Sequence, residues 1–249
     1  MTARRFNFLT LLAGTLFLIL VGFPAEAQSI NLDLGGGEGE TVSGRVIQLV
    51  LMITILSLAP GILMTITSFT RFIVVLSLLR TGLGTQGAPP NAVLVSLALF
   101  LTFFVMGPTF EQAWEQGVDP LTKGEITEEV AFERASTPFQ SFMLTHVRQD
   151  DLELFIDLSG REIETAEDTP MTVLAPAFMV SELRRAFEIG FLLFLPFLII
   201  DLVVSAILMA MGMMMLPPVT ISLPFKLIFF VLVDGWHLVA GSLVKSFTG

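Results

Sequence analysis

Four long apolar segments alternate with polar segments along this chain. They span residues 46–79, 93–106, 189–211 and 225–240. Segments of this hydrophobicity at helical length are typical of helices that cross a membrane. We therefore expect an all-α, polytopic membrane protein built from helical hairpins, with four crossings.

The first apolar segment is too long for one upright crossing. At about 1.5 Å per residue, a helix over 46–79 exceeds the ~30 Å of hydrocarbon in a bilayer. We expect one crossing to about Ile66 and a helical extension to Arg80, with a kink or break near Pro60. The Gly-Pro pair that includes Pro108 is expected to end the second crossing in the same way.

Between the second and third apolar segments the chain becomes acidic. The stretch 111–188 holds 17 of the 23 Asp and Glu residues but only 6 of the 13 Lys and Arg residues. Apolar residues recur there at helical intervals, which predicts short amphipathic helices around 125–134, 138–148 and 150–157. We expect a small acidic helical domain over 111–175 that packs against another part of the protein, because so short a segment is marginal alone.

The composition agrees with a membrane protein and excludes several functions. Hydrophobic residues make up 53% of the chain, charged residues 14%, and the mean hydropathy is +0.81. The net charge of −10 argues against a nucleic-acid partner, which needs a basic surface. There is no cysteine, and the two histidines are far apart in sequence, so we expect neither a metal site nor a cofactor.

The N-terminus has the pattern of a secretory signal peptide over 1–27. Arg4 and Arg5 precede an apolar stretch at 8–23 and an Ala-x-Ala cleavage site that ends at Ala27. The alternative is an uncleaved first transmembrane helix, although its apolar core is shorter than the ~20 residues that a span needs. Cleavage would leave 28–45 as a flexible exported leader of a bacterial protein.

An exported N-terminus determines the expected topology. A first apolar hairpin covers 46–110, the acidic domain 111–175 lies on the periplasmic side, and a second hairpin with a Met-rich turn covers 176–249. Basic residues support a cytoplasmic location for the first internal loop, whereas the second has only Lys226. The prediction is a multi-pass protein of the bacterial inner membrane.

Charged residues within or beside the apolar segments are the first candidates for function. They are Arg71, Asp201, Lys226 and Asp234. A charge at the centre of a membrane helix costs about 2.5–3.5 kcal/mol, so these side chains should pair or face an aqueous interior. Lys226 could instead extend from a helix end to the interface, but Asp201 lies between Leu-Ile-Ile and Leu-Val-Val and has no such route.

A charged run at 176–191 enters the third apolar segment. Helical spacing places Glu182 one turn before Arg185, and Arg184 one turn before Glu188. These charges are either surface pairs that contribute about 0.3–0.5 kcal/mol or contacts to neighbouring subunits. The sequence leaves both possibilities open.

Methionines cluster in the turn between the third and fourth apolar segments, at Met209, Met211, Met213, Met214 and Met215. Methionine usually fills irregular gaps in a core. Three consecutive methionines cannot share one helix face, so some must project into a turn or cavity. A ring of such side chains from several copies would form a deformable hydrophobic constriction that gates by excluding water.

Two longer runs carry a family resemblance. They are PAFMVSELRRAFEIGF at 176–191 and PFKLIFFVLVDGW at 224–236, and the runs at 58–80, 88–91, 137–140 and 211–226 extend the match. With them the chain resembles the FliP family of flagellar biosynthesis proteins and its counterparts in virulence type III secretion systems.

The resemblance implies a core subunit of the flagellar type III protein export gate, required for flagellum assembly and located in the flagellar basal body. Family members form a ring of five copies with FliQ and FliR, contact other export components and membrane lipid, and pass unfolded flagellar proteins. It implies a gasket of Met213, Met214 and Met215, and inter-subunit charge contacts at Glu182 and Lys226. We extend that expectation to Arg71, Asp201 and Asp234.

Two other classes of function deserve comparison. A carrier for ions or small molecules would use Asp201 and Asp234 as cation sites, but no internal repeat is visible in the sequence. An intramembrane aspartyl protease would need a Gly-x-Gly-Asp context, which neither aspartate has. No nucleophile, base and orienting group occur together, so we expect no enzymatic activity.

Overall fold

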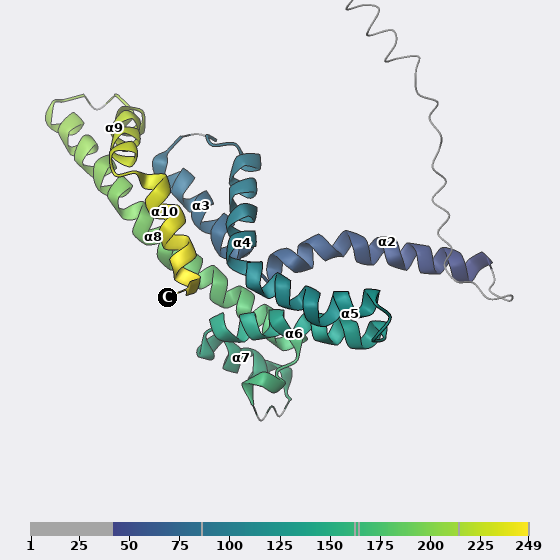
Figure 1. Ribbon diagram of the computed structural model, residues 1–249. Coiled ribbons are helices and arrows are strands. Elements are labelled where there is room, and N and C mark those ends of the chain that lie inside the picture. The colour runs from purple at the N-terminus through teal and green to yellow at the C-terminus, as the bar shows by residue number, and fades with distance from the viewer. Residues whose placement is uncertain (1–41, 86, 162, 164, 214, 249) are drawn as a thin grey trace, which may run out of the picture. The chain divides into compact units, whose positions relative to one another are not determined.

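A computed structural model describes residues 42–85, 87–161, 163, 165–213 and 215–248, and contains no strand in these ranges, as the all-α prediction requires (Figure 1). The elements, in chain order, are α2 (Val42–Thr65), α3 (Phe69–Leu83), α4 (Asn91–Ala113), the π-helical turn η1 (Trp114–Val118), α5 (Asp119–Thr122), α6 (Glu128–His146), α7 (Gln149–Ser159), the 3₁₀ turn η2 (Ala166–Asp168), α8 (Met171–Ala210), α9 (Pro218–Leu232) and α10 (Gly235–Thr248). The expected signal peptide at 1–27 and most of the leader lie outside the described residues. The chain divides into two units after Met52, and α3 to α10 all belong to the second unit.

Prolines do not end the helices where the sequence predicted. The break in the first apolar segment lies at 66–68, between α2 and α3, while α2 continues through Pro60. Similarly, α4 runs through Pro108 and α8 through Pro176 and Pro196. The prediction of a break near Pro60 was therefore wrong: a proline removes one backbone hydrogen bond, and α2 continues through it and ends at Thr65.

A first core forms where α3 packs between α4 and the middle of α8. The α3 residues Phe72, Val75, Leu76 and Leu79 are almost fully buried. Gly190 of α8 allows the two helices to approach closely, since a Cβ atom there would lie only 2.4 Å from Leu78 Cδ1. This contact fixes α3 along α8.

A second core joins the acidic segment to the first half of α8. Met143 of α6, Leu152 of α7 and Leu174 and Phe178 of α8 are buried together. The helices predicted at 125–134 and 138–148 form a single helix, α6, and α7 lies close to the predicted 150–157. The acidic segment thus packs against α8.

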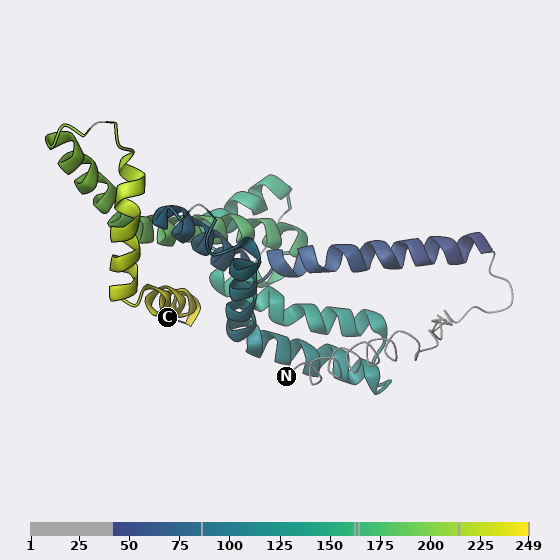
Figure 2. The same ribbon diagram turned by 90° about the horizontal axis from the view of Figure 1, so that it is seen from above.

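Two helical stretches in the described chain are long and apolar enough to cross a membrane, Asn91–Thr122 and Met171–Ala210. The number rises to three if α9 and α10, which meet at an angle of 64°, form one broken span. Figure 2 shows α9 returning beside the end of α8, and α10 leaving α9 at this bend. By length and hydrophobicity, the described helices thus provide two or three membrane crossings, where the sequence predicted four. The helix of the fourth apolar segment is broken at Asp234, whose φ is +51°.

Candidate functional site

A buried ion pair joins α3 to α8. Arg71 Nη2 donates to Glu182 Oε1 at 2.5 Å, and Arg71 Nε donates to Glu182 Oε2 at 2.8 Å. Both side chains are essentially inaccessible to solvent. This two-pronged geometry satisfies both carboxylate oxygens, which is the arrangement that makes a buried charge tolerable.

The same arginine also holds the end of α10. Arg71 Nη1 donates to the carbonyl oxygen and to Oγ of Ser246, each at 2.9 Å. The guanidinium carbon of Arg71 lies 3.5 Å from the centroid of the Phe247 ring, a cation–π contact. Arg71 therefore connects three helices that are far apart in sequence.

Phe247 is the centre of an aromatic cluster. Its ring lies 5.5 Å from Phe72 of α3, 5.9 Å from Phe142 of α6 and 5.1 Å from His146 of α6, measured between centroids. The Nε2 atom of His146 also lies 3.3 Å from the Phe247 carbonyl oxygen. The C-terminal turn thus packs where the first and second cores meet.

A second buried charge joins α9 to α8 and α3. Lys226 Nζ donates to Asp201 Oδ2 at 2.6 Å and to the Gly82 carbonyl oxygen at 3.0 Å, while Ser222 Oγ donates to Asp201 Oδ1 at 2.5 Å. We call Asp201, Ser222 and Lys226 the polar junction. Because Lys226 and Ser222 occupy the Asp201 carboxylate, this aspartate is not a vacant cation site of the kind that a carrier requires.

Helix spacing predicted one of the ion pairs of the charged run 176–191 correctly and the other incorrectly. Arg184 and Glu188 form the expected exposed pair at 3.2 Å, but Glu182 bonds to Arg71 and not to Arg185. Asp234 is exposed at the break between α9 and α10, and its carboxylate forms no ion pair with another described residue. Contacts of these charges with other subunits stay a prediction.

Several partners of these charges were not found from the sequence. No sequence pattern marks these partners, and only the fold brings them close to Arg71 and the polar junction. They are Ser246, Phe247, Ser222 and the carbonyl of Gly82.

Among the residues that the structure describes, no cluster of three or more His, Asp or Glu side chains is suited to bind a metal.

The Met turn, residues 211–217, connects α8 to α9, and its described methionines are exposed. Met211 is 67% exposed, Met213 40% and Met215 99%. Met214, the third residue of the predicted gasket, lies outside the described residues. Gly212 turns the chain with a φ of +74°, a conformation that suits glycine.

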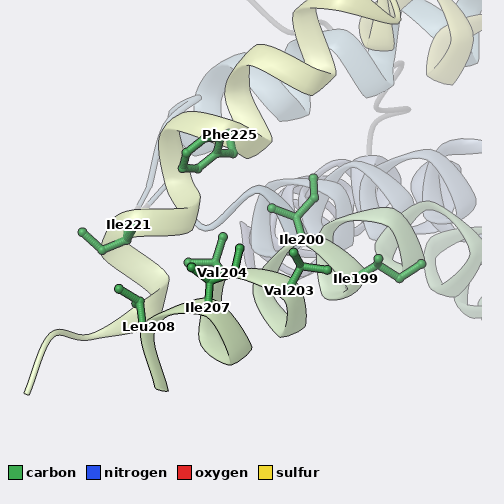
Figure 3. Close-up of a pocket in the computed structure, with 8 residues that line it drawn as sticks. All are labelled: Ile199, Ile200, Val203, Val204, Ile207, Leu208, Ile221 and Phe225. Carbon is green, nitrogen blue, oxygen red and sulfur yellow. The ribbon is translucent and has the colours of Figure 1, made fainter. Parts of the chain in front are cut away.

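An apolar pocket of about 400 Å³ lies between α8 and α9 beside this turn. Figure 3 shows side chains of α8 on one side and of α9 on the other, and all of the lining residues are aliphatic or aromatic: Ile199, Ile200, Val203, Val204, Ile207, Leu208, Ile221 and Phe225. The pocket begins next to the polar junction and extends toward the turn.

Comparison with known proteins identifies the family. The FliP family model matches residues 52–243. A flagellar biosynthetic protein FliP of Caulobacter vibrioides is 57% identical over 98% of this chain and 91% of its own length. The proteins of the same name from Bacillus subtilis and Aquifex aeolicus are 53% and 47% identical, over 88% and 94% of this chain and 98% of their own lengths. With these matches spanning nearly the whole sequence, the chain belongs to the FliP family.

Proposed function

We propose that this chain is a core subunit of the flagellar type III protein export gate, in which unfolded flagellar proteins pass through a channel that it helps to form. Family membership and the names of its relatives as flagellar biosynthetic proteins support this role. The proposal includes a ring of five copies with FliQ and FliR in the bacterial inner membrane. It assigns no catalysis to the chain.

The observation that carries the proposal is the exposed Met turn at the end of a hairpin fixed at its base. Met213 and Met215 project from a turn between two apolar helices, while buried charges hold the helices below it. Flexible thioether side chains adapt to irregular surfaces. Several copies of this turn around one axis would form the gasket of the closed channel, with Met214 as its third residue.

Exposed apolar surface supports assembly in a membrane. Large apolar side chains of α8 and α9 are more than half exposed, which is unfavourable in water and suits either lipid or neighbouring subunits. They include Phe191, Leu192, Ile199, Leu202, Ile207, Val219, Phe225, Ile228, Val231 and Leu232. The proposed ring would bury part of this surface and leave the rest to the bilayer.

The charges divide into two groups under this proposal. The first group forms two ion pairs within the chain, Arg71 with Glu182 and Lys226 with Asp201. Any contact of these residues with a neighbouring subunit would be additional to these pairs. Asp234 is exposed and without an ion-pair partner among the described residues, which makes it the first candidate for such a contact. We also propose that the acidic segment 111–175 faces the periplasm, after removal of the signal peptide.

Export and ion leakage together test the proposal. The chain is expressed in a flagellated bacterium that lacks its own FliP, and exported flagellar protein and membrane ion permeability are measured. Wild type should restore export without leakage, and replacement of Met213, Met214 and Met215 by glycine should make the assembled gate leak. Replacement of the same three residues by leucine is the matched control, because leucine keeps their volume and apolar character.

The two parts of the proposal fail separately. If the wild-type chain reaches the membrane but restores no export, the role in the export gate is wrong. If export is restored but the glycine variant stays impermeable to ions, the gasket assignment is wrong.

A further inference from the structure

Arg80, in the last turn of α3, is a positive charge without an acidic partner among the described residues. The sequence contains no Asp or Glu between residues 41 and 110, and Arg80 takes part in none of the ion pairs of the described chain. The polar junction lies close by, since Lys226 donates to the carbonyl oxygen of Gly82, but the charges of Lys226 and Asp201 cancel each other. The charge of Arg80 is therefore unbalanced.

The two arginines of α3 use their guanidinium groups differently. Arg71 donates from Nε and Nη2 to the two carboxylate oxygens of Glu182. Arg80 donates from Nη1, to Asn91 Oδ1 at 2.5 Å and to the carbonyl oxygen of Pro89 at 3.4 Å. The Nε–Nη2 edge of Arg80 forms no hydrogen bond with a described residue. An edge of this kind binds a carboxylate or a phosphate through two parallel hydrogen bonds.

A pocket of about 720 Å³ lies beside Arg80, which we call the loop pocket. It is formed where the loop from α3 to α4 meets the start of α9 (Figure 1). Its described lining residues are Arg80, Thr81, Gly84, Gly87, Asn91 and Val219.

The lining of the loop pocket suits an anion. None of its described residues is acidic, so no carboxylate competes for the free edge of Arg80. The side-chain amide nitrogen of Asn91 donates to no described residue and can add a hydrogen bond. Asn91 also begins α4, and the positive end of a helix dipole favours a negative charge.

The position of the loop pocket favours a lipid over a soluble anion. Asn91 is the first residue of the stretch Asn91–Thr122, which is long and apolar enough to cross a membrane. The end of a membrane helix lies among the lipid headgroups, where basic pockets bind phosphate groups. Further along the same helix, Phe100, Phe103 and Phe104 are more than half exposed, which suits contact with acyl chains.

From these observations we infer that the loop pocket binds the phosphate group of an anionic phospholipid. The Nε–Nη2 edge of Arg80 is the two-pronged donor, and the amide of Asn91 is a further donor. A lipid with net negative charge is preferred, because a zwitterionic headgroup brings its own cation and leaves the charge of Arg80 unbalanced. The inference goes beyond the proposed function, since it concerns the single chain and does not depend on a gate.

Native mass spectrometry of the full chain in detergent measures this binding directly. The probes are dioleoylphosphatidylglycerol and dioleoylphosphatidylcholine, which share their acyl chains and phosphate but differ in net charge. At equal lipid concentration, we expect at least fivefold more chain to carry the phosphatidylglycerol.

Two arginine variants locate the bound lipid. Arg80→Gln should lower the fraction bound to phosphatidylglycerol at least fivefold, because it removes both the charge and the two-pronged edge. Arg134→Gln is the matched control and should bind like the wild type, since Arg134 is an exposed arginine of α6 without an ion pair among the described residues.

The possible results decide between the sources of phosphate. Equal binding of the two lipids, or wild-type binding of phosphatidylglycerol by Arg80→Gln, would overturn the inference. Excess inorganic phosphate should leave the lipid bound. If it displaces the lipid, the loop pocket takes free phosphate and the assignment to a phospholipid is wrong.

A second variant keeps the test valid if Arg80→Gln disturbs the loop. Thr81→Phe fills the loop pocket from an exposed position and leaves the bonds from Arg80 to Asn91 and Pro89 in place. We expect the same loss of phosphatidylglycerol binding, with a melting temperature in detergent equal to that of the wild type. Undiminished lipid binding by this variant would place the lipid elsewhere and refute the site.

Discussion

Arg71 and Glu182 are separated by 111 residues in sequence and form a two-pronged ion pair with side chains that are 1% and 0% exposed. The pair fixes the start of α3 against α8, and Arg71 continues to Ser246 at the end of α10. One charged residue thereby joins α3, α8 and α10.

Replacement of one residue of this ion pair should lower the stability of the fold. Glu182→Ala leaves the guanidinium of Arg71 buried without its anion, and we expect a loss of about 3–5 kcal/mol of stability. The measurement is thermal unfolding of the protein in detergent. Glu188→Ala on the same helix is the matched control, because the exposed Arg184–Glu188 pair should contribute no more than about 0.5 kcal/mol. Equal melting temperatures for both variants would contradict the structural importance of the buried pair.

Gly190 should not tolerate a side chain. In Gly190→Ala the new Cβ would lie 2.4 Å from Leu78 Cδ1 and 3.2 Å from Leu78 Cβ, so α3 and α8 would have to move apart. We expect a destabilisation of about 1–3 kcal/mol, typical of an overpacked contact. Gly241→Ala in α10 is the control: its Cβ would meet nothing within 4 Å, and alanine should favour the helix by up to about 1 kcal/mol. Opposite signs in thermal unfolding would support this account, and a stabilised Gly190→Ala would refute it.

Phe247 should contribute through its ring and not only through its apolar area. Phe247→Leu keeps a large apolar side chain but removes the cation–π contact with Arg71 and the ring contacts with Phe72 and Phe142. The expected cost is about 1–2 kcal/mol. Phe132→Leu serves as the control, since Phe132 is 78% exposed and its replacement should change stability by less than about 0.5 kcal/mol. A Phe247→Leu variant as stable as the control would show that the ring contacts add little.

Asp234 allows a backbone role to be separated from a charge contact. Its φ of +51° lies in the left-handed region, which asparagine tolerates as well as aspartate. Asp234→Asn should therefore preserve the bend between α9 and α10 while it removes the charge. We expect unchanged stability of the isolated chain and a several-fold loss of assembled complex, measured by co-purification with the proposed partners FliQ and FliR. Assembly at the wild-type level would argue that Asp234 serves the bend alone.

The helices and the family were predictable from the sequence because their signals are local. Helical periodicity predicted α7 within a few residues, and the runs at 176–191 and 224–236 indicated the FliP family that the comparisons identify. Proline positions were misleading. Pro60 and Pro108 lie inside continuous helices, because each proline removes only one of the backbone hydrogen bonds that hold a helix of more than twenty residues.

The partners of the charges were not predictable because they depend on distant parts of the chain. Helix spacing suggested Arg185 as the neighbour of Glu182, but a residue buried in the α3–α8 interface takes the partner that lies across that interface, which is Arg71. Likewise, the sequence left open whether Lys226 pairs with another residue or extends from a helix end to the membrane interface. Its position beside α8 and α3 directs it to Asp201 and the Gly82 carbonyl.

Hydrophobicity, helical period and family motifs thus determined by themselves that the chain is helical, contains segments apolar enough to cross a membrane and belongs to the FliP family. Only the tertiary structure decided that Arg71 meets Glu182, that Lys226 meets Asp201 and that an apolar pocket separates α8 from α9 beside the Met turn. The physical reason is the range of the interactions. Backbone hydrogen bonds and periodic burial act over a few residues, whereas the pairing of a costly buried charge depends on which helices pack together.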